Sequence, residues 1–211
     1  MTITIFGASG AIGNLLVKQA LDEHYHVKAY VRNPDKITFS HPNLELIKGE
    51  LNDLDKINKA ISGSEAVIST LGPSMNIRAK GYPILEGHRN ILKAMEVEKV
   101  LRFITLATPS VKFEKDEKSV ATIMPSIIAK LFLPRAYREI VQVGDLVKSS
   151  NLNWTIVRII SPTNGPDMGK VTVSFGDRRL KFNLSRADIA RFMLGQVKDT
   201  HYIHSMPIIG G

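Results

Sequence analysis

The chain has 211 residues, of which 44% are hydrophobic and 23% charged, and its formal net charge is +8 at pH 7. These values are typical of a globular chain that can bury a sizeable core, and the absence of cysteine excludes disulfides, thiolate catalysis and cysteine-ligated metal sites. No apolar run approaches the roughly 18 residues that a membrane span needs, so we expect no membrane partner.

The first segment has the pattern of a strand, a glycine turn and a helix. Residues 2–6 are apolar and β-branched, Gly7, Gly10 and Gly13 follow at G-x-x-G-x-x-G spacing, and residues 15–24 have a helical pattern. Gly7 allows a tight turn, Gly10 lets the backbone approach a phosphate, and Gly13 lets the helix pack closely on the strand. Although the commonest fingerprint is G-x-G-x-x-G, this context indicates a dinucleotide-binding unit whose helix N-terminus faces the phosphates. Because a core strand starts at residue 2, we expect no signal peptide and a cytoplasmic protein.

Strands and helices are then predicted to alternate along most of the chain. Strands are predicted at 26–31, 44–48, 66–71, 102–107 and 153–159, and helices at 53–61, 84–98 and 135–150. The segment 111–134 has no clear period, but its part 121–133 is expected to form a short helix over the mouth of the site. Alternation implies right-handed crossovers, so we predict a Rossmann-like, doubly wound parallel sheet in one α/β domain that spans residues 1–211.

The C-terminal part is predicted to differ from this repeat. Residues 170–175 and 180–184 flank Gly176-Asp177-Arg178-Arg179 and resemble a β-hairpin. A helix is predicted over 185–198, with Ser185 as its N-cap and Asp188 at its third position. A last strand is predicted over 202–209. This gives a small hairpin and helix region at the end of the domain.

Arg32 bears on the choice of cofactor. An acidic residue at the end of the second strand would hold the ribose hydroxyls of NAD, but this chain has Arg32 there. A guanidinium holds a 2′-phosphate through charge-assisted hydrogen bonds. We therefore predict NADP(H) as the cofactor, with an ordinary surface arginine as the alternative.

Other partners are not indicated. None of the six histidines pairs with a second ligand at metal spacing, so no metal site is expected. The lysines and arginines are spread along the chain without a basic block, which argues against a nucleic-acid partner. A monomer or a homodimer is expected.

The chain resembles the atypical short-chain dehydrogenases/reductases with an NAD(P)-binding, NmrA-like or biliverdin reductase B-like domain. The resemblance lies in GASGAIG at 7–13, VRNPDK at 31–36, AVISTLGP at 66–73, RFITLATPS at 102–110 and SSNLNWTIVRI at 149–159. It implies that the glycine turn and Arg32 bind NADP, that Glu50 and Leu51 border the adenine, and that residues 71–73 and 159–163 approach the ribose and nicotinamide. The cofactor-binding residues are then expected to be Gly7, Ser9, Gly10, Ala11, Ile12, Gly13, Arg32, Glu50, Leu51, Leu71, Gly72, Pro73, Thr108, Ile159 and Ile160.

The chain also departs from this family. No tyrosine has a lysine four residues on, so the Tyr-x-x-x-Lys acid is absent, and Ser161 stands where biliverdin reductase-like members carry a histidine. Thr108, Ser110 and Tyr137 are the candidate catalytic residues, with turn or helix-cap roles as the alternative for the two hydroxyls.

Two functions are compatible with this pattern. The first is an NADPH-dependent reductase that transfers hydride to a small conjugated acceptor such as a flavin, a quinone or a tetrapyrrole. Such an acceptor takes its proton from water or a weak donor, and Arg135 is a candidate contact for an anionic one. The second is a non-catalytic NADP(H)-binding redox sensor of the NmrA-like type, which the missing tyrosine favours.

Overall fold

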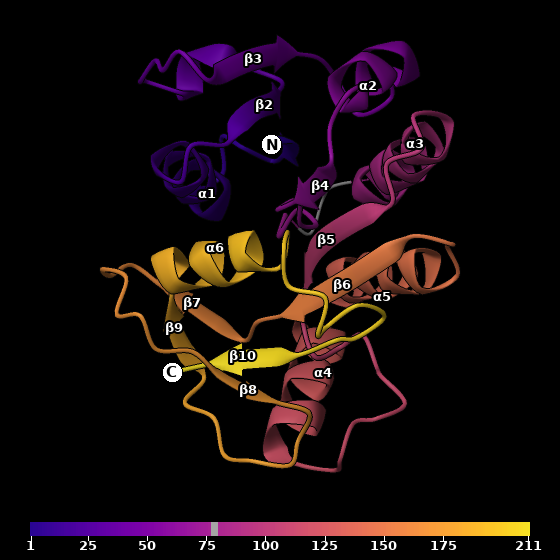
Figure 1. The fold of residues 1–211 in the computed structure, drawn as a ribbon. Helices are drawn as coiled ribbons and strands as arrows, with labels where there is room; N and C mark the ends of the chain where they lie inside the picture. The colour runs from indigo at the N-terminus through magenta and orange to yellow at the C-terminus, as the bar shows by residue number, and fades with distance from the viewer. Residues whose placement is uncertain (77–79) are drawn as a thin grey trace.

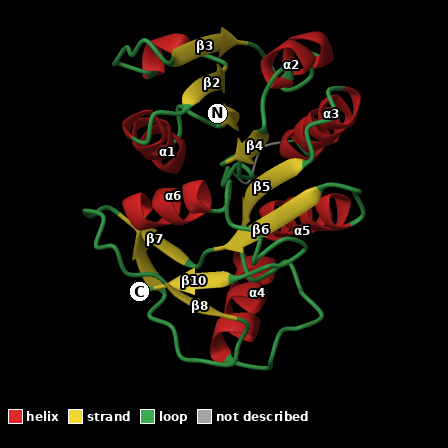
Figure 2. Ribbon diagram, viewed as in Figure 1, coloured by secondary structure: helices red, strands yellow, loops and turns green. Residues whose placement is uncertain are grey.

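The computed structural model describes residues 1–76 and 80–211. Its centre is an eight-stranded sheet (Figures 1 and 2). The strands of this sheet are β1 (Thr2–Phe6), β2 (His26–Val31), β3 (Leu44–Lys48), β4 (Ala66–Ser69), β5 (Arg102–Ala107), β6 (Asn153–Arg158), β8 (Thr172–Ser174) and β10 (Ile208–Gly210). A second, two-stranded sheet contains β7 (Ser161–Thr163) and β9 (Asn183–Ser185).

The strand order of the large sheet is β3-β2-β1-β4-β5-β6-β10-β8. All neighbours are parallel except β8 and β10, which pair antiparallel. The chain therefore winds outward in one direction from β1 to β3 and in the other from β4 to β6. The predicted Rossmann-like, doubly wound fold is confirmed, and its order reverses between β1 and β4, where such sheets bind ligands.

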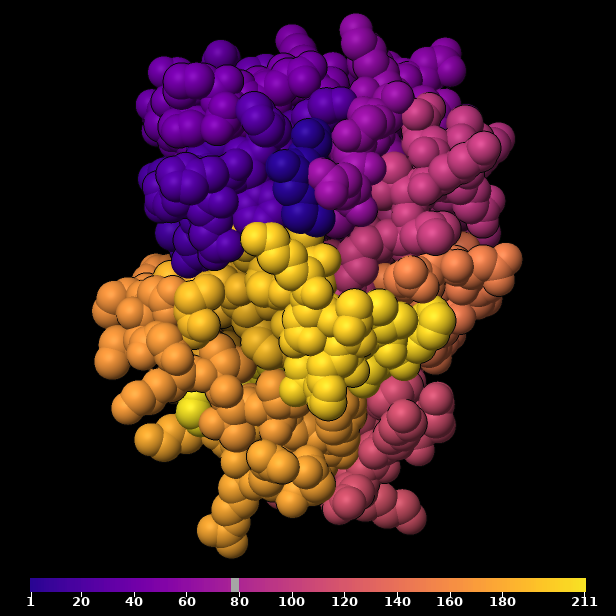
Figure 3. All heavy atoms as spheres, viewed as in Figure 1, coloured from indigo at the N-terminus to yellow at the C-terminus, as the bar shows by residue number. Residues whose placement is uncertain are grey.

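Helices cover both faces of the sheet. They are α1 (Ala11–Asp22), α2 (Leu54–Ile61), α3 (Pro83–Val97), α4 (Val120–Phe132), α5 (Pro134–Lys148) and α6 (Arg186–Gly195), with a short 3₁₀ turn at Pro34–Lys36. One core packs α1 and α6 against the sheet, and a second core packs α2, α3 and α5 against the other face (Figure 1). In the space-filling view the yellow C-terminal segments lie directly against the indigo N-terminal ones, in line with the contact between α1 and α6 (Figure 3).

The predicted hairpin around residues 176–179 is wrong. The chain does turn there, where the Phe175 N–H donates to the Asp177 carboxylate at 2.9 Å. However, β8 pairs with β10, and β9 pairs with β7 in the other sheet. The flanking strands therefore pair with distant partners rather than with each other.

The other predicted elements differ mainly at their ends. The last strand is β10 alone, because residues 201–204 form turns and His204 has a positive φ of 53°. The predicted cap of α6 is confirmed, since the Asp188 N–H donates to the Ser185 hydroxyl at 3.0 Å. The short helix predicted over 121–133 is present as α4.

Candidate functional site

A cavity of about 750 Å³ opens where the strand order reverses, at the carboxyl ends of β1 to β4. Its size is within the usual range of ligand and cofactor sites, roughly 300–1,000 Å³. The cavity is lined by Phe6, Gly7, Ser9, Gly10, Tyr30, Val31, Arg32, Gly49, Glu50, Leu51, Asn52, Thr70, Leu71, Gly72, Ser74, Pro83, Ile84, Glu86 and Gly87.

The glycine turn forms the wall between β1 and α1. Gly7 has φ 78°, the left-handed region that side chains avoid, and a Cβ there would lie 2.7 Å from Thr70 Oγ1. A Cβ on Gly13 would lie 2.2 Å from the Gly7 carbonyl oxygen. The Thr70 hydroxyl donates to the Gly7 carbonyl at 3.1 Å and ties the turn to the end of β4. A side chain at Gly7 or Gly13 would therefore force the turn away from β4 or from α1.

The N-terminus of α1 lies at this turn and is suited to an anion. Its N-cap is Gly10, no side chain caps it, and its first turn has no acidic residue. The first amides and the positive end of the helix dipole are thus available to negative oxygens.

Arg32 follows β2 at the rim of the cavity. It is exposed, and among the lining residues it is the only basic one. Within residues 1–76 and 80–211 it makes no hydrogen bond or ion pair. The other two charged side chains in the lining, Glu50 and Glu86, are acidic and repel anions. The Arg32 guanidinium is therefore the lining side chain that attracts an additional phosphate.

Tyr30 closes the cavity between β2 and β3. Its hydroxyl donates to the Glu50 carbonyl at 2.8 Å, and its ring packs 5.0 Å from the Phe6 ring. A Cβ on Gly49 would lie 2.1 Å from the Tyr30 hydroxyl, so the fit requires glycine there. Burial, with the negative charges of Asp53 and Glu50, raises the pKa of Tyr30 to about 12. Tyr30 therefore stays protonated and shapes the wall rather than acting as an acid.

The opposite edge of the cavity is the start of α3, which α5 holds in place. Glu139 is fully buried, and its Oε1 accepts the Ile84 N–H at 2.7 Å. Its Oε2 lies 3.2 Å from Nη1 of Arg135. Arg135 also donates to the carbonyls of Gly81 at 2.8 Å and Ser74 at 2.9 Å. Arg135 thus anchors the β4–α3 connection at two points, and its guanidinium is already engaged.

Behind the cavity wall lies a buried polar contact between β4 and α3. His88 Nδ1–H donates to the Ile84 carbonyl at 2.8 Å, so its Nε2 is free to accept the Ser69 hydroxyl at 3.1 Å. Burial lowers the pKa of His88 to about 4, and the ring is neutral at pH 7. Ser69 Oγ in turn lies 3.4 Å from the N–H of Leu71, which lines the cavity.

The structure brings only part of the expected site residues to the cavity. Those that line it are Gly7, Ser9, Gly10, Arg32, Glu50, Leu51, Leu71 and Gly72. Those that do not line it are Ala11, Ile12, Gly13, Pro73, Thr108, Ser110, Tyr137, Ile159 and Ile160. The residues of α4 do not line it either, so the expected cover over its mouth is not formed by this helix.

Sequence reasoning missed several lining residues. Tyr30 and Thr70 lie at the ends of β2 and β4, and Pro83, Ile84 and Gly87 belong to α3. The strand ends could have been found from the rule that ligands bind at the carboxyl edge of such sheets. Pro83 at the first position of α3 was a signal for a helix N-terminus.

The described residues also bear on whether the chain has a membrane-spanning helix or a metal site. No helix among them is long and apolar enough to cross a membrane. No group of three or more histidine, aspartate or glutamate side chains in the same residues is arranged to hold a metal ion.

A model of the family described as NAD(P)H-binding matches residues 7–200, which is most of the chain and includes every residue that lines the cavity except Phe6. The chain belongs to this NAD(P)H-binding family. Its relatives include the photosystem II assembly factor Ycf39 of Cyanophora paradoxa, which is 27% identical over 226 residues. That match covers 100% of this chain and 64% of Ycf39, so the chain spans less than two thirds of this relative.

Solved structures share the fold of this chain. A short-chain dehydrogenase/reductase from Veillonella parvula in complex with NADP has a TM-score of 0.79 and 21% identity, and the match covers 100% of this chain and 94% of that one. An anaerobillin reductase from Escherichia coli has a TM-score of 0.81 and 20% identity, with 100% and 97% of the two chains covered. At these identities the likeness establishes the Rossmann-like fold alone.

Proposed function

We propose that this protein is an NADPH-dependent reductase that transfers hydride to a small conjugated acceptor. The observation that carries the proposal is that one cavity is lined both by a tight glycine turn, at a helix N-terminus without a side-chain cap, and by Arg32. A dinucleotide fits this arrangement, because the turn leaves room for a pyrophosphate and the guanidinium can hold a 2′-phosphate. The NADP found in the Veillonella parvula relative supports the same cofactor.

The preference for NADPH over NADH is tested at Arg32. The loss of charge-assisted hydrogen bonds in Arg32→Ala removes about 1.5–3 kcal/mol, which is on the order of 10- to 100-fold in NADPH affinity. NADH affinity should change little. Lys36→Ala, a nearby exposed residue that does not line the cavity, is the matched control. Equal affinities of the unaltered protein for NADPH and NADH, measured by fluorescence titration, would contradict the preference.

The proposed chemistry demands little of the protein beyond orientation. When bound, the reduced nicotinamide supplies a hydride to an unsaturated acceptor, and one proton from water or a hydroxyl completes the two-electron reduction. Thr108, Ser110 and Tyr137 do not line the cavity, so we propose that the acceptor lies outside it and makes its polar contacts with these three residues. Ser110 Oγ is buried and has no hydrogen-bond partner in the described residues, so a ligand or water would satisfy it.

An acceptor panel tests turnover. Oxidation of NADPH is followed by its absorbance with flavins, quinones and linear tetrapyrroles, the last because of the anaerobillin reductase relative. We expect turnover with at least one class and a lower kcat in Ser110→Ala, with little loss of stability because no hydrogen bond is removed. Tight NADPH binding without turnover of any acceptor in the panel would contradict the reductase and favour the non-catalytic redox sensor. A cytoplasmic location and a monomer or homodimer remain predictions.

A further inference from the structure

Helix α4 buries its small side chains and exposes its large apolar ones. Its buried residues are small, namely Ala121, Thr122 and Ser126. Its large apolar side chains face outward, each between 41% and 72% exposed: Val120, Ile123, Met124, Ile127, Ile128, Leu131 and Phe132. Apart from Phe132, they follow the spacing of one helix face, and they are more than half of the large apolar side chains exposed in the described residues. We refer to these seven side chains as the α4 face.

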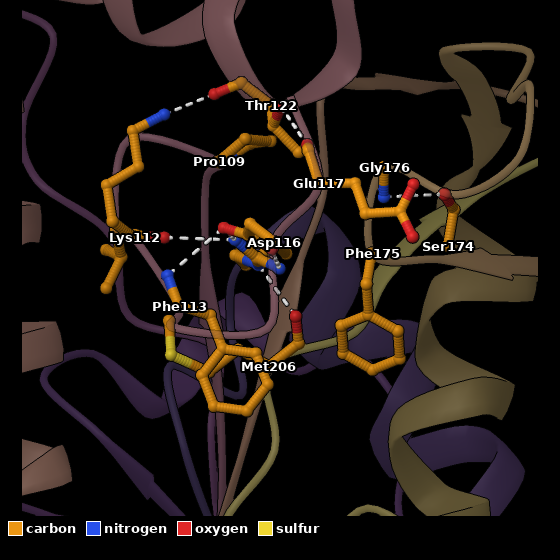
Figure 4. A network of polar contacts seen from close by, with 12 residues as sticks. Pro109, Lys112, Phe113, Asp116, Glu117, Thr122, Ser174, Phe175, Gly176 and Met206 are labelled. Carbon is orange, nitrogen blue, oxygen red and sulfur yellow. Dashed lines mark hydrogen bonds and ion pairs between the residues drawn. The ribbon is translucent and has the colours of Figure 1, made fainter. Parts of the chain in front are cut away.

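Hydrogen bonds fix this orientation from the inward side. The Thr122 hydroxyl donates to the Glu117 carbonyl at 2.8 Å, and the Ser126 hydroxyl donates to the Pro109 carbonyl at 3.1 Å. Lys112 donates to the Thr122 carbonyl, as the close-up shows (Figure 4). The helix cannot turn its apolar face inward without losing these bonds.

The segment that precedes α4 is itself held firmly. Asp116 forms two 2.6 Å contacts with the fully buried Arg158 of β6, and the Glu117 N–H donates to the Phe175 carbonyl at 2.7 Å. Figure 4 shows Asp116 and Glu117 between Thr122 of α4 and Gly176 in the turn after β8. The α4 face is therefore presented on a rigid support.

The charges along α4 itself are basic. Residues 118–138 contain four basic side chains and no acidic one, although the exposed Glu114 and Glu117 stand directly before them. Arg135 is paired with Glu139, whereas Lys118, Lys130 and Arg138 are exposed and form no ion pair in the described residues. The basic excess over residues 118–138 therefore favours an anionic surface.

We propose that α4 docks into the interface of an anionic lipid bilayer and makes the protein a peripheral membrane protein. Apolar side chains with flanking lysines and arginines are the pattern of helices that lie in the headgroup region. The 13 residues of α4 rise only about 20 Å, short of the ~30 Å hydrocarbon core, so the helix lies along the surface and does not span it.

Charge favours a lipid surface over a second copy of the chain. Two α4 faces placed together would bring Lys118, Lys130 and Arg138 of both copies close, with no acidic residue in 118–138 to pair with them. Anionic headgroups neutralise these charges. Docking also leaves the cavity open, because α4 lies at the lower end of Figure 1 and none of its residues lines the cavity.

The test is co-sedimentation of the full chain with vesicles of phosphatidylcholine alone and of phosphatidylcholine mixed with phosphatidylglycerol. Ile127→Glu with Leu131→Glu removes part of the α4 face, and Val97→Glu with Leu101→Glu is the matched control, because these two side chains are 61% and 54% exposed elsewhere. Lys118→Glu with Lys130→Glu tests the charges. Circular dichroism checks that each variant is folded, and light scattering measures the oligomeric state.

We expect the unaltered protein and the control variant to bind anionic vesicles and to bind neutral ones far less. The Ile127/Leu131 variant should bind at least about tenfold more weakly, and each lost basic residue should weaken binding roughly fivefold. Failure of the unaltered protein to bind anionic vesicles, equal binding to both vesicle types, or equal losses in the control would overturn the proposal. A dimer that becomes monomeric in the Ile127/Leu131 variant would identify the α4 face as a subunit interface instead.

Discussion

Gly13 and Gly195 are both helical glycines, but their surroundings differ in a way that can be tested. A Cβ on Gly13 would lie 2.2 Å from the Gly7 carbonyl oxygen, whereas a Cβ on Gly195 meets nothing within 4 Å. Gly13→Ala should destabilise the protein by about 1–3 kcal/mol, because helix and turn must separate, and it should weaken NADPH binding. Gly195→Ala should instead stabilise it by about 0.5 kcal/mol, since alanine costs less entropy in a helix.

Urea unfolding of the two variants and of the unaltered protein measures both signs. If Gly13→Ala were as stable as the unaltered protein and bound NADPH equally well, the close packing of α1 on the glycine turn would be wrong. Gly195→Ala is the control: it tests whether alanine at any helical glycine lowers the free energy of unfolding, or only alanine at Gly13.

At the residue scale, the sequence predicted those cavity residues whose role can be recognised from their neighbours in the sequence. Gly7, Gly10 and Arg32 lie within one strand-turn-helix unit and the strand that follows, so their neighbours are close in sequence. Ile84 and Gly87 contribute through α3, and their approach to the cavity depends on how α3 packs and on its contact with Glu139. Such contacts between distant segments leave no pattern in the chain itself.

Among the elements, α3 depends on a buried carboxylate from α5. Glu139→Ala would leave the Ile84 N–H without its partner and the Arg135 charge without its carboxylate. We expect a loss of about 3 kcal/mol in the free energy of unfolding. Removing one member of a buried pair leaves the charge of the other without a compensating partner. Glu139→Gln should recover part of this loss, since its side-chain oxygen can still accept the amide hydrogen bond.

Asp145→Ala is the control on the same helix. Asp145 pairs with Lys148 at 2.8 Å, but its side chain is 60% exposed. A pair of this kind contributes about 0.5 kcal/mol or less. Similar losses for Asp145→Ala and Glu139→Ala in denaturant unfolding would mean that Glu139 does not cap α3.

The elements that sequence reasoning misplaced share one physical feature. β8 and β9 flank a turn, yet β8 pairs with β10 and β9 with β7, so each strand is stabilised by a segment remote in sequence. A turn signal identifies where the chain reverses but not which strands become neighbours. The parallel strands β1 to β6 were predictable, because alternating strands and helices can be connected in few ways.

On the scale of the whole molecule, a buried neutral histidine links a helix to the sheet. His88 in α3 contacts Ser69 in β4 at 3.1 Å and the Thr105 hydroxyl in β5 at 3.5 Å. The ring is fully buried, and its Nδ1–H donates to the Ile84 carbonyl at 2.8 Å. Its protonation is therefore coupled to unfolding of the entire sheet rather than to a local movement.

The free energy of unfolding should consequently fall as the pH drops from about 6.5 to about 4. Burial lowers the pKa of His88 from 6.5 to about 4, so in this range the unfolded chain binds a proton that the folded chain does not. The full difference is on the order of 3 kcal/mol. Carboxyls with lowered pKa values, such as Asp53 and Asp177, act at lower pH, because their stabilisation is lost only below about 3.8. Urea unfolding at a series of pH values should show a shallower dependence in His88→Gln and an unchanged one in the exposed control His26→Gln. An NMR titration in which the His88 ring becomes charged near pH 6.5 in the folded protein would contradict the argument without the use of any variant.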